Sequence, residues 1–433
     1  MLQDIDDFFS RRMYRRISDC WNRPIAGPPL AGTVAVMLRS SCDGNATFEP
    51  TGDIVKCVNL GSYNYLGFVD DWAVSCGQKV HNIASITPIS ACAPAAGGGY
   101  TALHSALEDA VARFVGKEAA IVFGTGFATN ASGIPALGGK GSLLVSDSLN
   151  HSSIVTGARS SGATVSVYKH DDLRGLAKLL RESVIAGQPT TGRSWKKIVV
   201  LVEGLYSMEG ETVDLAAIVA IAKKYRAYVY LDEAHSIGAL GATGRGMCEH
   251  AGVAPCDVDI LMGTFTKSFS AMGGYIAASR AFIDHVRSSS AGFLLDTAMA
   301  PAVTQQVLTA FSVLRGDDGT GIGAEKLARL HDNGNYFRAK LVAMGCAVLG
   351  ARDSPVIPIM LYNPTKVAAF SRECLARGVA VVVVGYPATP VILARARFCV
   401  SAGHTRADLD YALSQIEEVC ILLRLRYGRS CFG

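Results

Sequence analysis

Two short segments, about 35 residues apart, carry side chains that together can hold a cofactor with a reactive aldehyde. They are Leu231-Asp232-Glu233-Ala234-His235 and Gly263-Thr264-Phe265-Thr266-Lys267-Ser268-Phe269. A lysine at the end of a strand supplies the amine that forms a Schiff base with an aldehyde. A carboxylate keeps a pyridine nitrogen protonated, and the pyridinium withdraws electrons well enough to stabilise a carbanion. Lys267 and Asp232 therefore predict a site for pyridoxal phosphate.

The neighbours of these two residues decide the interpretation, because an isolated lysine after a strand is usually a solvated surface residue. Thr264 and Ser268 place hydroxyls beside Lys267, where they suit a phosphate. Asp232 ends an apolar run, and a buried carboxylate is costly without a cationic partner such as a protonated pyridine. His235 is expected to reach the phenolic oxygen of the cofactor; the alternative is a histidine that caps the next helix.

Further candidates follow other predicted strands. The imidazole of His151 suits stacking on a flat ring and contact with a substrate carboxylate, although a loop histidine fits as well. Gly126 lies in a tight turn before a helix, where free N–H groups favour a dianion. The Ser207 hydroxyl is expected near the phenolic oxygen. The planar guanidinium of Arg397 is suited to clamp a carboxylate, whereas Arg395 is expected to be a surface charge.

The elements that position these residues are short apolar runs separated by helix-length segments. Such runs are typical of parallel strands buried on both faces, so the sequence predicts an α/β fold with a doubly wound, mostly parallel sheet of seven strands. Ligands collect at the carboxyl ends of such strands, so the candidate residues are expected to line one crevice. The predicted strands span residues 120–123, 142–145, 164–168, 198–202, 228–231, 258–262 and 274–277.

A turn-rich stretch at residues 315–321 marks a boundary, beyond which helices and strands alternate on a smaller scale. We therefore expect an N-terminal arm with a substrate-side segment (1–85), a large cofactor-binding domain (86–315) and a small α+β C-terminal domain (316–433). In the last part the sequence predicts a helix over 326–344, strands over 347–349, 356–361, 379–384 and 398–401, and a closing helix from about 407.

Composition excludes several other classes of protein. The 433 residues are 49% hydrophobic and carry a net charge of +4, so the chain can bury a large core and has no strong field for nucleic acid. The 12 cysteines lack zinc-site spacing and are expected to be reduced thiols, and no metal site is predicted. The sequence contains no run of about 18 apolar residues, so no membrane span is predicted. Residues 1–16 do not resemble a signal peptide.

Beyond single motifs, the chain resembles the α-oxoamine synthases, which are fold-type I pyridoxal-phosphate enzymes of the aspartate aminotransferase-like architecture. These enzymes condense an amino acid with an acyl-CoA and release carbon dioxide. Within the family, the chain is most similar to the catalytic second subunits of eukaryotic serine palmitoyltransferases, and the similarity runs from about Arg11 to the final helix. The segments that carry it include residues 59–67, 195–198, 206–210, 231–236, 263–269, 353–356 and 387–390.

The resemblance implies a role for each matching residue. It makes Lys267 the Schiff-base lysine and Asp232 the partner of the ring nitrogen, with His151 stacked over the ring and His235 and Ser207 near the phenolic oxygen. It also sets Gly126, Phe127 and Thr264 around the phosphate and Tyr63, Asn64 and Arg397 on the substrate side.

The same resemblance implies the reaction and the partner. L-Serine and palmitoyl-CoA would give 3-ketodihydrosphingosine, the first step of sphingolipid synthesis. The chain would act in a heterodimer with a lysine-less first subunit at the cytosolic face of the endoplasmic reticulum membrane. Family members usually carry an N-terminal membrane segment that has no counterpart here, so attachment through the partner is expected. The basic segment 11–21 would lie on a membrane surface or form a solvated arm at the dimer interface.

Three positions depart from the family pattern and leave alternatives open. Ala95 replaces the usual arginine of a glycine-rich turn, Ser270 replaces a common glycine, and Asp296-Thr297 stands where Thr-Ser is usual. These changes bear on turnover and partner fit more than on cofactor binding. The alternatives are a soluble α-oxoamine synthase with another amino acid and acyl-CoA, or a non-catalytic paralogue that binds the cofactor and acts as a scaffold.

Overall fold

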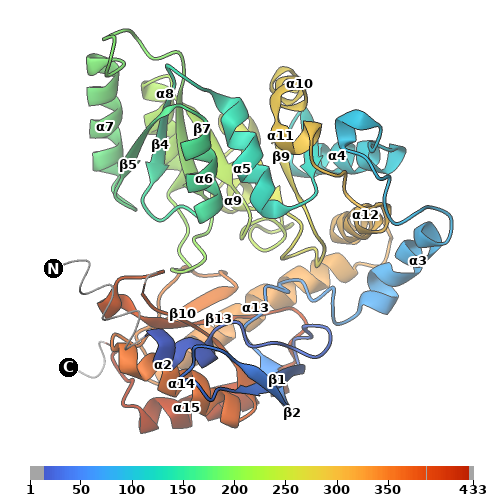
Figure 1. Ribbon diagram of the computed structural model, residues 1–433, viewed down its shortest axis with the longest axis vertical. Coiled ribbons are helices and arrows are strands. Elements are labelled where there is room, and N and C mark those ends of the chain that lie inside the picture. The colour runs from blue at the N-terminus through green and yellow to red at the C-terminus, as the bar shows by residue number, and fades with distance from the viewer. Residues whose placement is uncertain (1–13, 387, 429–433) are drawn as a thin grey trace. The chain divides into compact units, whose positions relative to one another are not determined.

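The computed structural model describes residues 14–386 and 388–428, and these divide into two compact units (Figure 1). Unit 2 comprises Asp71–Tyr206 and Glu211–Leu327. Unit 1 gathers the described residues up to Asp70, the short segment Ser207–Gly210 and the described residues from Ala328 onward. The three-part division predicted from the sequence differs from this grouping, because the N-terminal part joins the C-terminal part in one compact unit.

Unit 2 is built on a seven-stranded sheet in the order β3-β9-β8-β7-β6-β4-β5. Strands β4 to β8 pair in parallel, whereas β9 is antiparallel to both of its neighbours. The predicted mostly parallel sheet is confirmed, and every strand starts and ends within two residues of its predicted bounds. The strands are β3 (Ala119–Phe123), β4 (Leu143–Asp147), β5 (Thr164–Tyr168), β6 (Ile198–Glu203), β7 (Tyr228–Asp232), β8 (Ile260–Thr264) and β9 (Gly274–Ala278).

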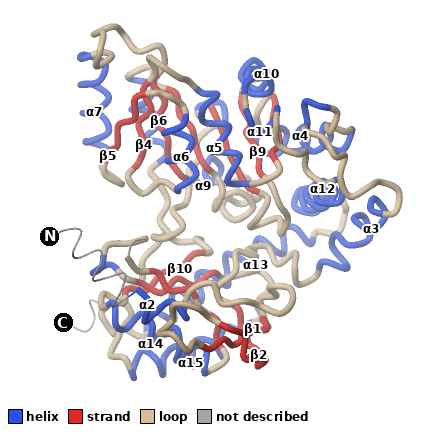
Figure 2. The backbone as a smooth tube through the Cα atoms, viewed as in Figure 1, coloured by secondary structure: helices blue, strands red, loops and turns tan. Residues whose placement is uncertain are grey.

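Burial on both faces explains the continuous apolar runs of this sheet. Every residue of β3, β4, β6, β8 and β9 is buried, so these strands have no solvent face that would require polar residues. Helices α5 and α6 lie side by side against the sheet, and their Ile134 and Ile154 join a core with Leu144 and Leu201 (Figures 1 and 2).

The helices of unit 2 start and stop at residues suited to those positions. Thr125, Asp172 and Asp214 each accept a hydrogen bond from a backbone N–H of the helix that follows, as N-cap residues do. Gly116 directly follows α4 and Gly316 directly follows α12, and both adopt the left-handed conformation common at helix C-termini. The helices are α3 (Gln78–Ala84), α4 (Ala102–Val115), α5 (Gly126–Leu137), α6 (Ser152–Ser160), α7 (Leu173–Ala186), α8 (Leu215–Lys224), α9 (Met247–His250), α10 (Arg280–Ser289), α11 (Ala291–Leu294) and α12 (Pro301–Arg315).

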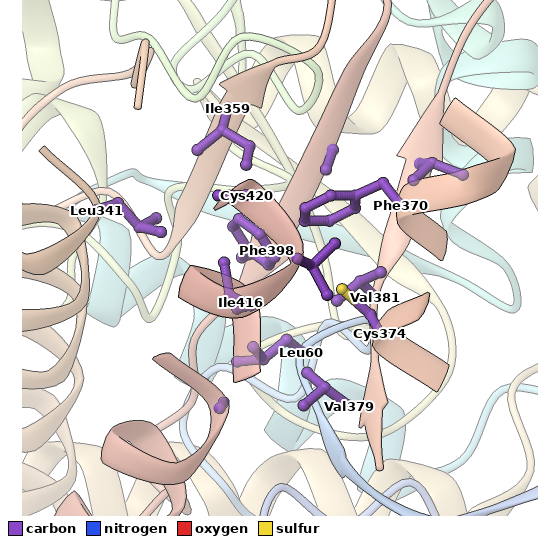
Figure 3. Packing of buried hydrophobic residues seen from close by; sticks show 14 of the residues in the cluster. Leu60, Leu341, Ile359, Phe370, Cys374, Val379, Val381, Phe398, Ile416 and Cys420 are labelled. Carbon is purple, nitrogen blue, oxygen red and sulfur yellow. The ribbon is translucent and has the colours of Figure 1, made fainter. Parts of the chain in front are cut away.

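Unit 1 contains two three-stranded sheets, β1-β2-β11 and β10-β13-β12. Leu60, Phe370 and Phe398 pack in its core with helix α15, which contributes Ile416 and Cys420 (Figure 3). The elements are α2 (Arg15–Ile17), β1 (Val34–Ser40), β2 (Glu49–Asn59), β10 (Val356–Met360), α14 (Pro364–Ala376), β11 (Val379–Ala380), β12 (Val382–Val384), β13 (Arg395–Cys399) and α15 (Arg406–Leu422). Helix α13 (Ile322–Ala343) begins before Ala328 and continues into this unit.

Three predictions for this part of the chain need correction. The strand predicted over 347–349 is a single bridge between Val348 and Ile359. The strand predicted over 379–384 divides at Val381, because β11 pairs in parallel with β2 while β12 pairs with β13. The strand predicted over 398–401 begins earlier, at Arg395. The turn-rich stretch at 315–321 connects α12 and α13, whereas the two compact units divide between Leu327 and Ala328, within α13.

The sequence predicted neither a membrane span nor a metal site, and the structure bears on both only for the residues that it describes. Among the described helices, none has the length and apolar character needed to cross a bilayer. Within residues 14–386 and 388–428 no group of three potential metal ligands occurs. Of the basic segment 11–21, residues 11–13 lie outside the described residues, as does Pro387 of the segment 387–390.

Candidate active site

The sheet of unit 2 brings most of the predicted residues to one edge. Asp232 is the last residue of β7 and Thr264 the last of β8, and these strands are parallel neighbours. Lys267 follows Thr264 by three residues. Gly126 begins α5 just after β3, and His151 precedes α6 just after β4. Carboxyl ends of strands therefore supply this group of residues, as expected for a doubly wound sheet.

Both carboxylate oxygens of Asp232 accept a hydrogen bond. Oδ1 accepts from the backbone N–H of Ala234 at 2.8 Å, and Oδ2 accepts from Nδ2 of Asn130 at 2.7 Å. The Asp232 side chain is buried, as is His235 three residues later. These neutral donors fix the buried carboxylate at the strand end, where a protonated pyridine can pair with it.

The start of α5 lies against the end of β8. A Cβ atom at Gly126 would come within 2.5 Å of Oγ1 of Thr264, so only glycine fits there. Oγ1 of Thr264 also contacts Oγ1 of Thr266 and donates to the carbonyl of Gly273, both at 2.9 Å. The Ser268 hydroxyl, expected to face a phosphate, instead donates to the carbonyl of Ile237 at 2.7 Å and is buried.

His151 is held through both its backbone and its ring. Its backbone N–H donates to Oε1 of Glu203 at 2.5 Å, and its ring lies 6.2 Å from the Phe127 ring, edge to face. Burial lowers the pKa of His151, with an opposing contribution from Asp232 and a further lowering by Lys267. The charges of Asp232 and Lys267 therefore both act on His151, and these are three of the residues predicted to contact the cofactor.

A second group of predicted residues lies in unit 1. The Arg397 guanidinium lies 5.0 Å above the Tyr63 ring, and its Nη1 donates to the carbonyl of Ser207 at 3.2 Å. Arg397 is only 4% exposed, and its Nε has no hydrogen-bond partner among the described residues. A buried guanidinium N–H without a partner is suited to a carboxylate ligand. The Asn64 amide donates to Oδ2 of Asp70 at 2.7 Å.

Arg395 is buried, which contradicts the surface charge expected from the sequence. It forms an ion pair with Glu209 at 3.0 Å and donates to the carbonyl of Met208 at 2.9 Å. Alternate residues of a strand share a face, so Arg395 and Arg397 of β13 both meet the segment Ser207–Gly210. The two arginines explain why this short segment belongs to unit 1.

Sequence reasoning missed three buried polar residues: Asn130, Ser153 and Glu203. Nδ2 of Asn130 donates to Oγ of Ser153 at 2.9 Å as well as to Asp232, and Ser153 contacts His151. One signal was available, since Asn130 lies one helical turn after Gly126 and therefore on the same side of α5.

The three departures from the family pattern have local structural correlates. Ser270 has a φ of 48°, a left-handed conformation that glycine adopts without steric cost. The turn that contains Ala95 pairs with the segment that contains Asp296, through a bridge between Pro94 and Thr297. A cavity of about 390 Å³ is lined by Asp296–Ala300 together with Gly124, Thr125, Met272 and Val303.

Comparisons with known proteins extend over nearly the whole chain. A family model described as aminotransferase class I and II matches residues 55–416. Long chain base biosynthesis protein 2a of Oryza sativa subsp. japonica is 54% identical over 423 residues, 98% of this chain and 86% of the relative. Serine palmitoyltransferase 2 of Dictyostelium discoideum is 50% identical over 428 residues, 98% and 87% of the two chains. A solved structure described as SPT with a PLP internal aldimine has a TM-score of 0.84 and 25% identity, covering 98% of this chain and 99% of that one.

Proposed function

The chain belongs to the aminotransferase class I and II family, and we propose that it is the catalytic subunit of a serine palmitoyltransferase (SPT). Its reaction is the decarboxylative condensation of L-serine with palmitoyl-CoA to 3-ketodihydrosphingosine. The observation that carries the proposal is the pair of adjacent parallel strands that end in Asp232 and in Thr264, three residues before Lys267. The relatives named above support the choice of substrates.

The residues at the strand ends fit pyridoxal phosphate. When bound, this cofactor supplies an aldehyde for amines and a ring that withdraws electrons from the substrate carbon. Lys267 would provide the amine and Asp232 the carboxylate for the ring nitrogen. Gly126 and Thr264 would hold the phosphate, since the missing side chain of Gly126 keeps the first N–H groups of α5 close to the Thr264 hydroxyl.

The chain's own residues then carry out distinct tasks. Nζ of Lys267 would move the proton of serine Cα, because a neutral amine within reach of that proton can serve as a general base. His151 would pack on the cofactor ring and Phe127 would lie near its phosphate, with His235 and Ser207 at the phenolic oxygen. Nε of Arg397 would donate to the serine carboxylate, since it has no hydrogen-bond partner within residues 14–386 and 388–428.

The proposal includes a partner and a location. The chain would form a heterodimer with a lysine-less first subunit, and Tyr63 and Asn64 would lie on the substrate side of its site. The complex would act at the cytosolic face of the endoplasmic reticulum membrane. The resemblance of residues 195–198 and 353–356 to second subunits supports this assembly. Co-purification of an endogenous partner with serine-dependent activity is the expected result.

The test is release of carbon dioxide from amino acids labelled at the carboxyl carbon. We expect release from serine that depends on palmitoyl-CoA, and little release from glycine or alanine. The Lys267→Ala variant is the negative control. Palmitoyl-CoA-dependent release from glycine or alanine without release from serine would instead identify an α-oxoamine synthase of other specificity. No release from any of the three, with cofactor bound, would identify the scaffold alternative.

A further inference from the structure

A chain of hydrogen bonds runs through unit 2 beneath the proposed cofactor site. The Tyr230 hydroxyl contacts Oδ1 of Asn130 at 2.7 Å, and Nδ2 of Asn130 contacts both Oδ2 of Asp232 and Oγ of Ser153, at 2.7 and 2.9 Å. Oγ of Ser153 then contacts Nδ1 of His151 at 2.8 Å. Tyr230, Asn130, Asp232 and Ser153 are at most 3% exposed, so water does not compete for these bonds.

Tyr230 fixes the direction of the first bonds. Burial raises the pKa of Tyr230 well above its ordinary value, with a further contribution from Asp232, so the hydroxyl keeps its proton and donates it to Oδ1 of Asn130. The NH₂ group of Asn130 must then face Asp232, because the opposite amide orientation would set two oxygens 2.7 Å apart. Its two protons are directed to Oδ2 of Asp232 and Oγ of Ser153.

The direction of the remaining bonds follows. Oγ of Ser153 accepts from Asn130, so its own proton is directed to Nδ1 of His151. The backbone N–H of Ser153 donates to the same nitrogen at 3.2 Å. Two donors therefore converge on Nδ1, so this nitrogen must be the acceptor and carries no proton.

We propose that Asn130 and Ser153 are positioning residues that hold His151 as a neutral imidazole with its proton on Nε2 and tie it to the Asp232 carboxylate. The role of this tie rests on the proposed function, in which Asp232 pairs with the ring nitrogen of the cofactor. A protonated His151 would compete for that carboxylate and would repel the pyridinium. The hydrogen-bond chain removes this competition.

The groups around His151 act on its protonation in both directions. Asp232 favours the imidazolium, whereas burial and Lys267 oppose it. Glu203 binds the backbone N–H of His151 through Oε1 and adds a second nearby carboxylate. The two donors at Nδ1 act in the same direction as burial and Lys267, and together they keep the ring neutral beside Asp232.

The experiment uses ¹⁵N spectra of the cofactor-loaded protein labelled only at histidine, with His151→Asn to assign the His151 signals. We expect an unprotonated Nδ1 and a protonated Nε2 near neutral pH. A hydrogen bond to the neutral form disfavours the charged form, so Ser153→Ala should raise the pKa of His151 in a titration. Asn130→Ala should raise it less, because the Ser153 hydroxyl stays but loses its fixed direction.

Two control variants separate this role from a general loss of structure. Ser153→Thr keeps the hydroxyl and should retain the native titration. Ser371→Ala removes a buried serine hydroxyl in α14 of unit 1 and should leave the His151 titration unchanged. In Ser153→Ala, kcat/KM for serine should fall by roughly tenfold to a hundredfold, as expected for a misplaced catalytic group.

A proton on Nδ1 of His151 in the unmodified protein would overturn the assigned direction. An unchanged His151 titration in both Ser153→Ala and Asn130→Ala, in folded protein, would overturn the positioning role. Neither spectrum depends on turnover, so failure of the serine assay would count against the proposed function alone.

Discussion

Lys267 offers the sharpest test at the scale of a single residue. Its proposed task is chemical, so Lys267→Ala should abolish activity and the visible absorbance of the imine. The cofactor-free variant should still unfold cooperatively in urea, because the proposed task of Lys267 lies in chemistry rather than in building the fold. Absorbance spectra, activity assays and urea denaturation measure the three quantities. Retained activity would mean that the Schiff base forms on another lysine.

Lys326 supplies a matched lysine substitution with the opposite outcome. It is 2% exposed and pairs with Asp71 at 2.6 Å within unit 2. Lys326→Ala leaves Asp71 without its ammonium partner and should lower the free energy of unfolding by about 1–3 kcal/mol. The imine absorbance should persist in the loaded protein. Loss of that absorbance in a folded variant would contradict the division between a chemical and a structural lysine.

Glu233 predicts a pH dependence of stability. Burial raises its pKa to about 7, from 4.5. Below about pH 4.5 Glu233 is protonated in both the folded and the unfolded chain, so it does not lower the free energy of unfolding. As the pH rises from there through 7, ionisation is easier in the unfolded chain than in the buried site, so the free energy of unfolding falls. Relative to Glu233→Gln, which stays neutral, the free energy of unfolding of the unmodified protein should fall by on the order of 3 kcal/mol between pH 4.5 and pH 8. Urea denaturation of both proteins at several pH values checks this, and parallel curves would contradict it.

At the scale of elements, helix α15 begins with a reciprocal cap. The Thr405 side chain and the Asp408 side chain each bond the backbone N–H of the other residue. Thr405→Ala should lower the free energy of unfolding by about 1 kcal/mol, whereas Thr405→Ser should preserve it. Urea denaturation of the two variants makes the comparison. Equal loss in both would show that the methyl group, rather than the hydroxyl, stabilises this helix end.

The elements also show what sequence reasoning can and cannot reach. Strands such as β6 and β8 were predictable because burial on both faces leaves a continuous apolar run. The division of the run 379–384 into β11 and β12 was not predictable, because its two halves look alike in sequence but pair with different sheets. Within the site, strand ends revealed Asp232 and Lys267. The burial of Arg395 was hidden because its partner, Glu209, lies almost two hundred residues earlier.

At the scale of the molecule, unit 1 depends on a core shared by segments distant in sequence. Phe398 is fully buried, and its ring lies 5.4 Å from Phe337 and 6.3 Å from Phe370. Phe398→Ala should lower the free energy of unfolding by about 3–5 kcal/mol, and Phe398→Leu by less because it leaves a smaller cavity. Denaturant titration ranks the two. A smaller loss for alanine than for leucine would show that this core readily collapses around a void.

The pairing of β2 with β11 bears on how the protein is made. Val58 meets Val379 in this parallel pair, so a ribosome must add more than three hundred residues before the hairpin of β1 and β2 finds its neighbour. At about 5–20 residues per second that wait lasts roughly a quarter of a minute to a minute. Unit 2 ends at Leu327 and can fold during that time. The nascent hairpin meanwhile exposes an unpaired strand edge, the kind of surface that chaperones shield.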